Sequence, residues 1–321
     1  MEQLAAALGA GERPAIATAL NLIDDNRAQA REQATALLDL IIEPDGAANH
    51  LVGLTGPPGV GKSSLTAALI DVWRGRDLRV GILAVDPSSP VSGGALLGDR
   101  LRMKTDPVDD GVFVRSLSSR GQFGGLSTEV WPMCLVMLYC FDVVLVETVG
   151  VGQREADIAH SCDTTCFVAQ PGSGDSVQFL KAGVLEVPHI LVVNKQDMGA
   201  VATRTLSELA SSVQGEHPDG NWNVPVLATS ATQRTGIVEL ADTLQAHHRQ
   251  LADSGDLQAR RRRYQAHWLL KRLEENYGRA GLRQLGGADA LLAELCDQPG
   301  NPLVQYAQYQ HRLSAARPPA D

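Results

Sequence analysis

The chain has 321 residues, of which 44% are hydrophobic and 4% aromatic, and its formal net charge is −9. This length accommodates one large α/β domain with helical additions. Phosphate backbones and anionic lipids do not attract an acidic protein, so the composition argues against a general nucleic-acid binder or a membrane-surface protein.

Cysteine content and apolar segments indicate the compartment. The five cysteines are odd in number and mostly embedded in apolar segments, so no disulfide framework is expected. The start of the chain lacks the basic and apolar regions of a signal peptide. The most apolar stretch, residues 134–146, is too short to span a bilayer and carries Asp142. We therefore expect a cytoplasmic protein with no membrane partner.

The first 46 residues have the apolar spacing of helices. Apolar side chains recur three and four residues apart between Ile16 and Ile23 and again between Ala34 and Ile41. This pattern predicts two helices, separated near residues 21–27 and ended by Pro44-Asp45-Gly46. Residues 1–46 are thus expected to form an N-terminal helical extension.

From His50 the pattern changes to strands that alternate with helices. Nearly continuous apolar strands in such a pattern indicate a parallel sheet that is covered on both faces. The sequence therefore predicts an α/β domain over residues 47–250, with a mainly parallel sheet flanked by helices. The expected strands are residues 51–54, 80–85, 112–114, 143–146, 165–168, 189–193 and 224–228.

A complete G-x-x-x-x-G-K-S phosphate-binding loop joins the first strand to a helix. Its glycines allow several backbone N–H groups to point into one concavity at a helix N-terminus. Lys62 is expected to reach the β- and γ-phosphates, and the Ser63 hydroxyl to ligate Mg²⁺. The motif predicts a P-loop NTPase that binds a nucleoside triphosphate, with these nucleotide-binding residues: Gly56, Pro57, Pro58, Gly59, Val60, Gly61, Lys62, Ser63 and Ser64.

Acidic residues at two strand ends suit a site for Mg²⁺ and the γ-phosphate. Asp86 ends the second strand, where it can hold a Mg²⁺-bound water. Glu147 ends a later strand and takes the acidic role of the D-x-x-G motif of small GTPases, in which Gly150 would meet the γ-phosphate. A third segment, Pro171–Asp175, includes Gly172, Gly174 and Asp175, and is either a nucleotide-sensing loop or an ordinary surface turn.

Residues that follow two later strands indicate guanine. Asn194-Lys195-Gln196-Asp197 follows a buried strand and resembles the guanine-specificity element of GTPases. The Asp197 carboxylate can accept hydrogen bonds from guanine N1–H and N2–H₂, whereas adenine lacks this pair of donors. Ser230 and Ala231 resemble the element whose backbone N–H meets guanine O6. The expected nucleotides are GTP and GDP.

Beyond Gly236 the sequence is again helical. It predicts a helix over residues 237–251, a break at 253–255, a long helix through Tyr277 and a helix–helix turn at 299–302. Residues 251–321 are expected to form a C-terminal extension that serves a partner or dimerisation. The run Arg260–Arg263 is read as a solvated helix face or subunit contact rather than an RNA site.

Taken together, these motifs resemble the MeaB/ArgK family of P-loop GTPases, in register from about Arg13 into the Arg260 cluster. The resemblance implies a homodimeric GTPase that attends an adenosylcobalamin-dependent acyl-CoA mutase, usually methylmalonyl-CoA mutase. Such a protein gates cofactor loading and protects or reactivates the mutase through GTP hydrolysis. The segments that carry the resemblance are residues 53–63, 85–89, 97–100, 120–127, 147–153, 171–175 and 194–197.

The resemblance also implies roles for individual residues. Lys62, Glu147 and Gln153 would serve catalysis, with Gln153 orienting water. Hydrolysis is expected to be slow alone and stimulated by the partner, because no arginine finger is evident. The metal would be held by Ser63, Asp86, Asp99 and Glu147, and switch or partner contacts would involve Arg120, Arg154, Gly172, Gly174, Asp175 and Lys181.

Two departures from the family pattern fall on these communication surfaces. Lys181 is followed by Ala182 where the family often has a second lysine, and Arg154 stands where a serine is common. The client could therefore be a variant mutase that acts on another acyl-CoA.

Three other functions remain open at the level of sequence. A GTP-dependent metallochaperone would need exposed ligands, and the one candidate cluster is His160, Cys162 and Cys166. A small-molecule kinase, the older interpretation of ArgK proteins, would need an acceptor pocket and a base. A nucleotide-dependent scaffold would bind its partner equally well with GDP or GTP.

Overall fold

A computed structural model of the chain describes residues 1–42, 49–86, 109–118, 129–148, 158, 161–172, 188–213 and 222–315. Its contacts divide the chain into two compact units. The sheet unit comprises residues 49–127 and 141–254. The helical unit combines residues 1–48, 128–140 and 255–321.

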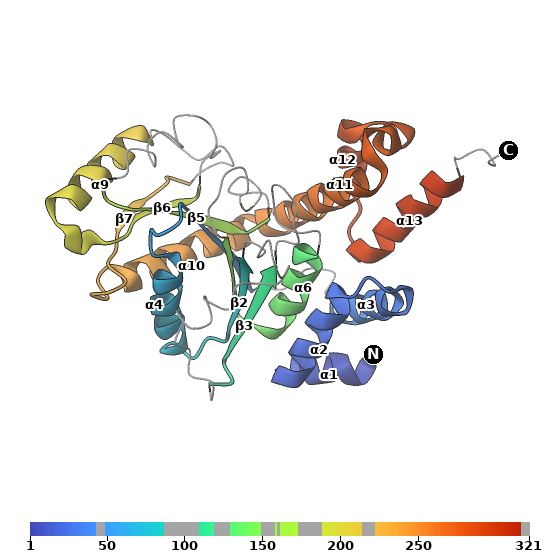
Figure 1. The fold of residues 1–321 in the computed structure, drawn as a ribbon, viewed down its shortest axis with the longest axis horizontal. Coiled ribbons are helices and arrows are strands. Elements are labelled where there is room, and N and C mark those ends of the chain that lie inside the picture. The colour runs from blue at the N-terminus through green and yellow to red at the C-terminus, as the bar shows by residue number, and fades with distance from the viewer. Residues whose placement is uncertain are drawn as a thin grey trace, which may run out of the picture. The chain divides into compact units, whose positions relative to one another are not determined.

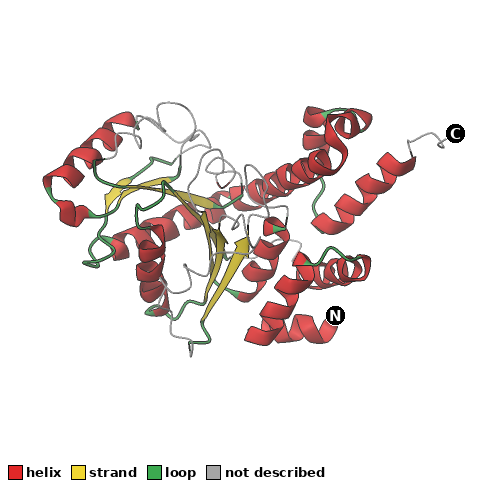
Figure 2. Ribbon diagram, viewed as in Figure 1, coloured by secondary structure: helices red, strands yellow, loops and turns green. Residues whose placement is uncertain are grey.

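A seven-stranded sheet forms the centre of the sheet unit, in the order β3-β2-β4-β1-β5-β6-β7 (Figures 1 and 2). Each pairing between neighbouring strands is parallel. Every strand expected from the sequence is present, and the predicted α/β fold with a parallel sheet is confirmed. The strands are β1 (His50–Thr55), β2 (Val80–Asp86), β3 (Val112–Ser118), β4 (Val143–Thr148), β5 (Thr164–Ala169), β6 (Ile190–Val193) and β7 (Val226–Ala228).

Helices cover both faces of this sheet, as the apolar strands require. Cys166 and Val168 of β5 belong to an apolar cluster with α4 (Lys62–Arg74) and α10 (Ile237–Ser254). Phe167 and Ala169 point to the opposite face, where they pack with α9 (Ala200–Ser212). Alternate residues of one strand therefore enter two cores, one on each side of the sheet.

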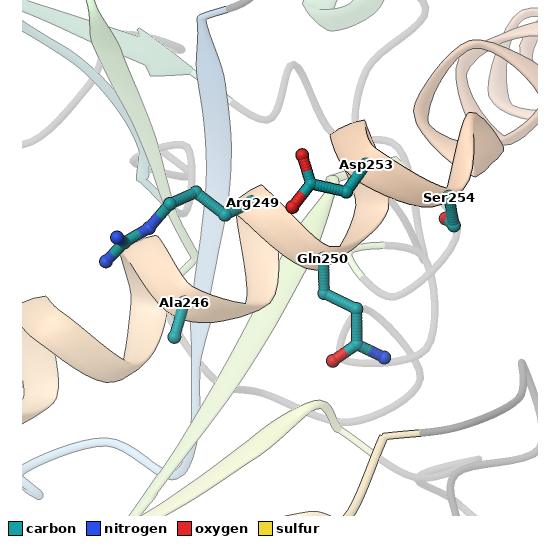
Figure 3. Close-up of a pocket in the computed structure, with 5 residues that line it drawn as sticks. All are labelled: Ala246, Arg249, Gln250, Asp253 and Ser254. Carbon is teal, nitrogen blue, oxygen red and sulfur yellow. The ribbon is translucent and has the colours of Figure 1, made fainter.

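Helix α10 is amphipathic, and its polar side bears a shallow depression near its C-terminus (Figure 3). Among the residues that the structure describes, this helix alone lines the depression. Its lining residues are Ala246, Arg249, Gln250, Asp253 and Ser254.

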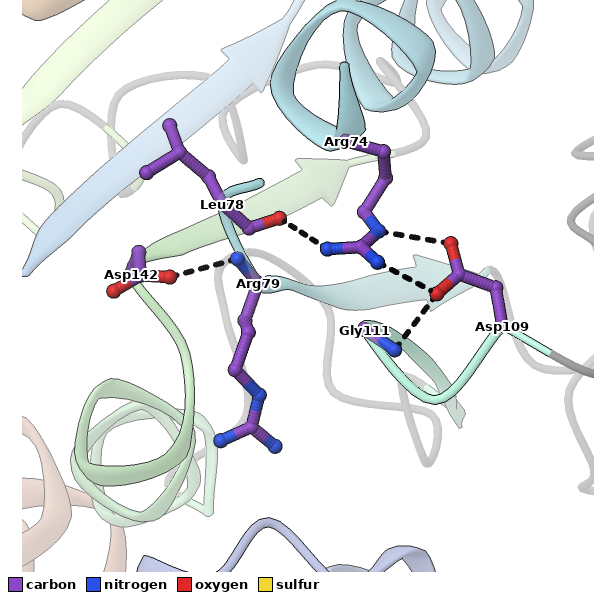
Figure 4. A network of polar contacts seen from close by, with 6 residues as sticks. All are labelled: Arg74, Leu78, Arg79, Asp109, Gly111 and Asp142. Carbon is purple, nitrogen blue, oxygen red and sulfur yellow. Dashed lines mark hydrogen bonds and ion pairs between the residues drawn. The ribbon is translucent and has the colours of Figure 1, made fainter. Parts of the chain in front are cut away.

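The amino-terminal ends of β2 and β3 are tied to the C-terminus of α4 (Figure 4). The Arg74 guanidinium donates to both carboxylate oxygens of Asp109, at 2.8 and 2.9 Å, and to the Leu78 carbonyl at 2.9 Å. The Gly111 N–H donates to the same carboxylate. A Cβ atom at Gly111 would lie 2.1 Å from Arg74 Cζ, so a side chain at this position would displace the guanidinium from its bonds to Asp109.

The ends of β1 and β5 at the same edge contact α10 through buried histidines. The Thr164 hydroxyl lies 2.7 Å from His50 Nε2 and 2.7 Å from His247 Nδ1. The His247 ring also lies against the rings of His189 and Trp222. These contacts fix α10 against the sheet with polar as well as apolar groups.

In the helical unit, three N-terminal helices contact α6 (Val130–Cys140). The sequence predicted two helices in this region, and two of the three, α2 (Arg13–Asp24) and α3 (Ala28–Ile41), match them. Helix α1 (Glu2–Gly9) was missed. Since α6 lies within residues 47–250 of the sequence but clusters with the helical unit, the division into three consecutive domains stays a proposal.

The C-terminal part of the helical unit contains α11 (Asp256–Gln284), α12 (Ala288–Cys296) and α13 (Pro302–Ala315). Gly255 begins α11 in the left-handed conformation, at the predicted break. Gly278 has non-helical angles of φ 63° and ψ −176°, directly after the predicted end at Tyr277.

The prediction that Arg260–Arg263 forms a solvated face is wrong for half of the run. Arg260 and Arg261 are buried, at 4% and 7% exposure, whereas Arg262 and Arg263 are exposed. Four consecutive residues turn through all sides of a helix, so a continuous basic run cannot keep to one face.

Candidate nucleotide-binding site

The phosphate-loop sequence forms the turn between β1 and α4, as predicted. Gly61 has φ 96° and stands directly before the first residue of α4. Gly56 has φ 142°, and a Cβ atom there would lie 2.2 Å from the Val168 carbonyl oxygen. Only glycine combines these backbone angles with such close contacts. The loop is therefore built from backbone groups at a helix N-terminus, which is the arrangement that favours anions.

Lys62 folds back over this loop. Its Nζ donates to the carbonyl oxygens of Gly56, at 2.6 Å, and Pro57, at 3.0 Å, and the residue is 7% exposed. The ammonium group is thus held against the loop backbone by two hydrogen bonds. A buried positive charge at this position suits a polyphosphate.

Glu147 lies beneath the first turn of α4 with two hydroxyl donors. Ser63 Oγ donates to Oε1 at 2.7 Å, and Thr66 Oγ1 donates to Oε2 at 3.1 Å. Glu147 sits in β4 between Leu54 of β1 and Ala84 of β2, and it is 4% exposed. A buried carboxylate is tolerable only with such partners. The sequence motifs pointed to Ser63 and Glu147 but missed Thr66.

The predicted guanine element contacts the phosphate loop directly. Asn194 Nδ2 donates to the Val60 carbonyl at 2.9 Å, and Lys195 Nζ donates to the Gly59 carbonyl at 2.7 Å. Segments 134 to 136 residues apart in sequence are joined by these bonds. The two motifs therefore form one structural site at the carboxyl edge of the sheet.

Asp197 and the Ser230–Ala231 element also lie together. Ser230 Oγ donates to Asp197 Oδ1 at 2.5 Å, while the Ala231 N–H donates to Asn194 Oδ1 at 3.2 Å. Asp197 is exposed, whereas Ser230 is 1% exposed. The buried hydroxyl holds one carboxylate oxygen and leaves the carboxylate accessible to a ligand.

Lys195 makes a further contact that the sequence did not indicate. Its Nζ lies 3.3 Å from Gln170 Oε1, at the end of β5. Two residues later the Gly172 N–H donates to Thr205 Oγ1 at 3.1 Å. The segment Pro171–Asp175 is thus bonded to α9 at its start, and the residue before it is bonded to the guanine element.

Several predicted site residues lie outside the described part of the chain. Asp86 ends β2, but only its backbone is described. By contrast, three predicted site residues are described and exposed: Ser64 in the first turn of α4, and Pro58 and Gly59 in the loop. The residues outside the description are Asp99, Arg120, Gly150, Gln153, Arg154, Gly174, Asp175 and Lys181.

The candidate metallochaperone ligands are not arranged as an exposed site. Cys162 and Cys166 are fully buried, and His160 lies outside the description. Burial raises the pKa of the Cys166 thiol far above its usual range, which disfavours the thiolate that binds metals. Within the described ranges no three His, Cys, Asp or Glu side chains gather as a metal site.

The described helices also bear on the membrane question. Among the residues that the structure describes, no helix is both long enough and apolar enough to cross a bilayer.

Comparisons with known proteins agree with this geometry. A family model described as methylmalonyl-CoA mutase-associated GTPase MeaB matches residues 16–280. A relative from Pyrococcus abyssi, named as a GTPase, is 42% identical over 86% of this chain and 82% of its own length. A Caenorhabditis elegans relative, methylmalonic aciduria type A homolog, mitochondrial, is 29% identical over 86% of this chain and 72% of its own.

A solved structure shares the fold of this chain. The crystal structure of a LAO/AO transport system kinase aligns with a TM-score of 0.67, at 25% identity, over 97% of each chain. The family model covers more than half of the chain, and it includes the phosphate loop, Glu147 and the guanine element. The chain belongs to the family of methylmalonyl-CoA mutase-associated GTPases named MeaB.

Proposed function

We propose that this protein binds GTP with Mg²⁺ at the carboxyl edge of the sheet, hydrolyses it, and uses the cycle to serve an adenosylcobalamin-dependent acyl-CoA mutase. The observation that carries the nucleotide assignment is the pair of bonds from Asn194 and Lys195 to the phosphate-loop carbonyls of Val60 and Gly59. A phosphate site and a base-reading element are thereby held in one unit.

The described side chains fit a Mg²⁺ ion. Mg²⁺ prefers oxygen ligands, and the Ser63 hydroxyl and Glu147 carboxylate lie 2.7 Å apart beside the phosphate loop. In this proposal Ser63 ligates the ion and Glu147 holds its outer shell, together with Asp86 and Asp99. The ion would neutralise charge on the phosphates during hydrolysis.

Catalysis in this proposal depends on positioning and charge. Lys62, whose ammonium is held over the loop, would stabilise charge on the phosphates. Gly150 would contact the γ-phosphate, and Gln153 would orient the attacking water. Turnover is expected to be slow without a partner, because phosphoryl transfer by such sites depends on a supplied positive charge. Arg120 and Arg154 are the proposed sources if a complex moves them.

The proposed client is methylmalonyl-CoA mutase or a mutase for a related acyl-CoA. Its support is the description of the matching family and the name of the Caenorhabditis elegans relative. The third switch, with Gly172, Gly174, Asp175 and Lys181, would carry the nucleotide state to the mutase. We further propose a cytoplasmic homodimer that uses the C-terminal extension, residues 251–321, and has neither nucleic-acid nor membrane partners.

The nucleotide assignment is tested by binding of GDP, GTP and ADP to the purified protein, measured by calorimetry. We expect guanine nucleotides to bind with at least tenfold higher affinity than ADP. Lys62→Ala should lose GTP binding, whereas Lys271→Ala, on α11 outside the proposed site, should not. Equal affinity for GDP and ADP would contradict the guanine assignment.

The partner assignment is tested by sedimentation of the protein with methylmalonyl-CoA mutase, in GDP or in a non-hydrolysable GTP analogue. A complex whose affinity differs between the two nucleotides supports the proposal. A complex that ignores the nucleotide would favour a scaffold, and no complex with any adenosylcobalamin-dependent mutase would contradict the proposed client.

A further inference from the structure

Thr66 belongs to no nucleotide-binding motif, yet it contacts the central carboxylate of the site. Its hydroxyl donates to Glu147 Oε2 at 3.1 Å, while Ser63 donates to Oε1 at 2.7 Å. Thr66 is fully buried. Thr66 lies three positions after Ser63 in α4, so the two hydroxyls lie on one face of the helix.

Two hydrogen bonds restrict the orientation of the Glu147 carboxylate more than one hydrogen bond would. The terminal torsion of a glutamate side chain is soft and broadly populated. Two donors, one on each oxygen, restrict this torsion more than the Ser63 hydroxyl alone does. With a donor on each oxygen, the plane of the carboxylate is fixed between α4 and β4.

Loss of the Thr66 hydrogen bond would also be costly in this buried environment. Glu147 is 4% exposed, and a buried charged acceptor is destabilised when it loses a hydrogen-bond donor. The Ser63 hydroxyl has a competing task in the proposed site, because it ligates Mg²⁺. Thr66 has no such task, so its bond can persist in every nucleotide state.

We propose that Thr66 is a positioning residue for the Mg²⁺ site and acts through Glu147. It holds Oε2, so that Oε1 stays directed towards Ser63 and the ion's outer shell. This inference rests on the proposed function, since the role of Glu147 towards Mg²⁺ belongs to that proposal.

The test compares Thr66→Val, which keeps the shape and removes the hydroxyl, with Thr66→Ser, which keeps the hydroxyl. Thr165→Val is the matched control, because Thr165 is equally buried in β5 and its hydroxyl has no hydrogen-bond partner among the described residues. Glu147→Gln is the reference for losing the carboxylate. Fluorescent GDP is titrated into the full-length protein at increasing Mg²⁺ and, separately, in EDTA.

We expect Thr66→Val to need about tenfold more Mg²⁺ for half-maximal enhancement of GDP binding, as for other residues that orient metal-site groups. Thr66→Ser should restore the wild-type midpoint, and Thr165→Val should not move it. Affinity in EDTA should change less than about twofold in Thr66→Val, since the phosphate loop itself is unaltered. Should the valine variant not fold, Thr66→Ala makes the same comparison.

The reference variant separates the two ways in which the inference can fail. If Glu147→Gln shifts the Mg²⁺ midpoint and Thr66→Val matches Thr165→Val, Thr66 does not position the site, although the proposed metal role stands. If Glu147→Gln leaves the midpoint unchanged, the metal role of Glu147 and the inference about Thr66 are both wrong.

Discussion

At the scale of single residues, the site is defined by side chains that bond to backbone carbonyls of the phosphate loop. Asn194 and Lys195 contact Val60 and Gly59, and Lys62 contacts Gly56. Each of these residues was predicted from a motif, because the chemistry of phosphate and guanine binding restricts residue types at fixed spacing. Thr66 was not, since its role depends on Glu147, 81 residues away in sequence.

Asp197→Asn should lower GDP affinity about 10- to 100-fold. The substitution exchanges the carboxylate oxygen that accepts from guanine N2–H₂ for an amide donor, and a hydrogen bond to a charged group contributes about 1.5–3 kcal/mol. Xanthosine diphosphate should gain affinity, because xanthine has a carbonyl where guanine has N2–H₂. Calorimetry with both nucleotides measures the change. The exposed Asp253→Asn on α10 is the control, and an unaltered preference in Asp197→Asn would refute the assignment of Asp197.

At the scale of elements, the strands were predictable because they are buried on both faces and therefore continuously apolar. Helix α1 was missed because its residues, rich in alanine, carry few apolar side chains with a helical period. The burial of Arg260 and Arg261 was also beyond the sequence, since it depends on which neighbours surround α11. Composition reports the charge of a segment, whereas packing decides which of its residues are buried.

Arg74→Ala should destabilise the sheet unit by about 1–3 kcal/mol, because it removes a bidentate bond to Asp109 that is only partly exposed. Arg204→Ala, which breaks an exposed pair with Glu208 four residues along α9, should cost less than about 0.5 kcal/mol. Urea unfolding measures both. Equal effects of the two substitutions would show that Arg74 does not secure this edge of the sheet.

Tyr309 of α13 should contribute to alkaline unfolding of the helical unit. Burial, together with the bond from its hydroxyl to Glu294, raises the pKa of Tyr309 to about 12. A tyrosine in the unfolded chain loses its proton at about pH 10. The folded chain keeps this proton to higher pH than the unfolded chain. The resulting contribution to the free energy of unfolding is therefore complete below about pH 10 and is lost as the pH rises towards 12.

Urea unfolding between about pH 9 and about pH 11.5 tests this sign. Tyr309→Phe should lose less stability over this interval than wild type, because phenylalanine has no proton to release. Tyr277→Phe, at a partly exposed tyrosine of α11, should keep the alkaline loss of wild type. If the free energy of unfolding fell equally with pH in wild type and in Tyr309→Phe, deprotonation of Tyr309 would not be linked to alkaline unfolding.

At the scale of the whole molecule, the chain combines a nucleotide-binding sheet unit with a helical unit assembled from three separate segments. The sequence predicted helices at both ends of the chain, but not that α6, from the middle, would cluster with them. That grouping arises from contacts between segments about 100 residues apart, which periodicity does not encode. In the proposed function, the C-terminal part of the helical unit serves dimerisation.

The most direct test of the central claim is GTP turnover by the purified protein, measured with and without adenosylcobalamin-dependent mutases, methylmalonyl-CoA mutase first. We predict slow turnover alone and at least tenfold stimulation by one mutase, with ATP hydrolysis unaffected. Lys62→Ala should show neither activity nor stimulation. Intact GTP hydrolysis that no such mutase changes would contradict the proposed client and direct attention to a different partner.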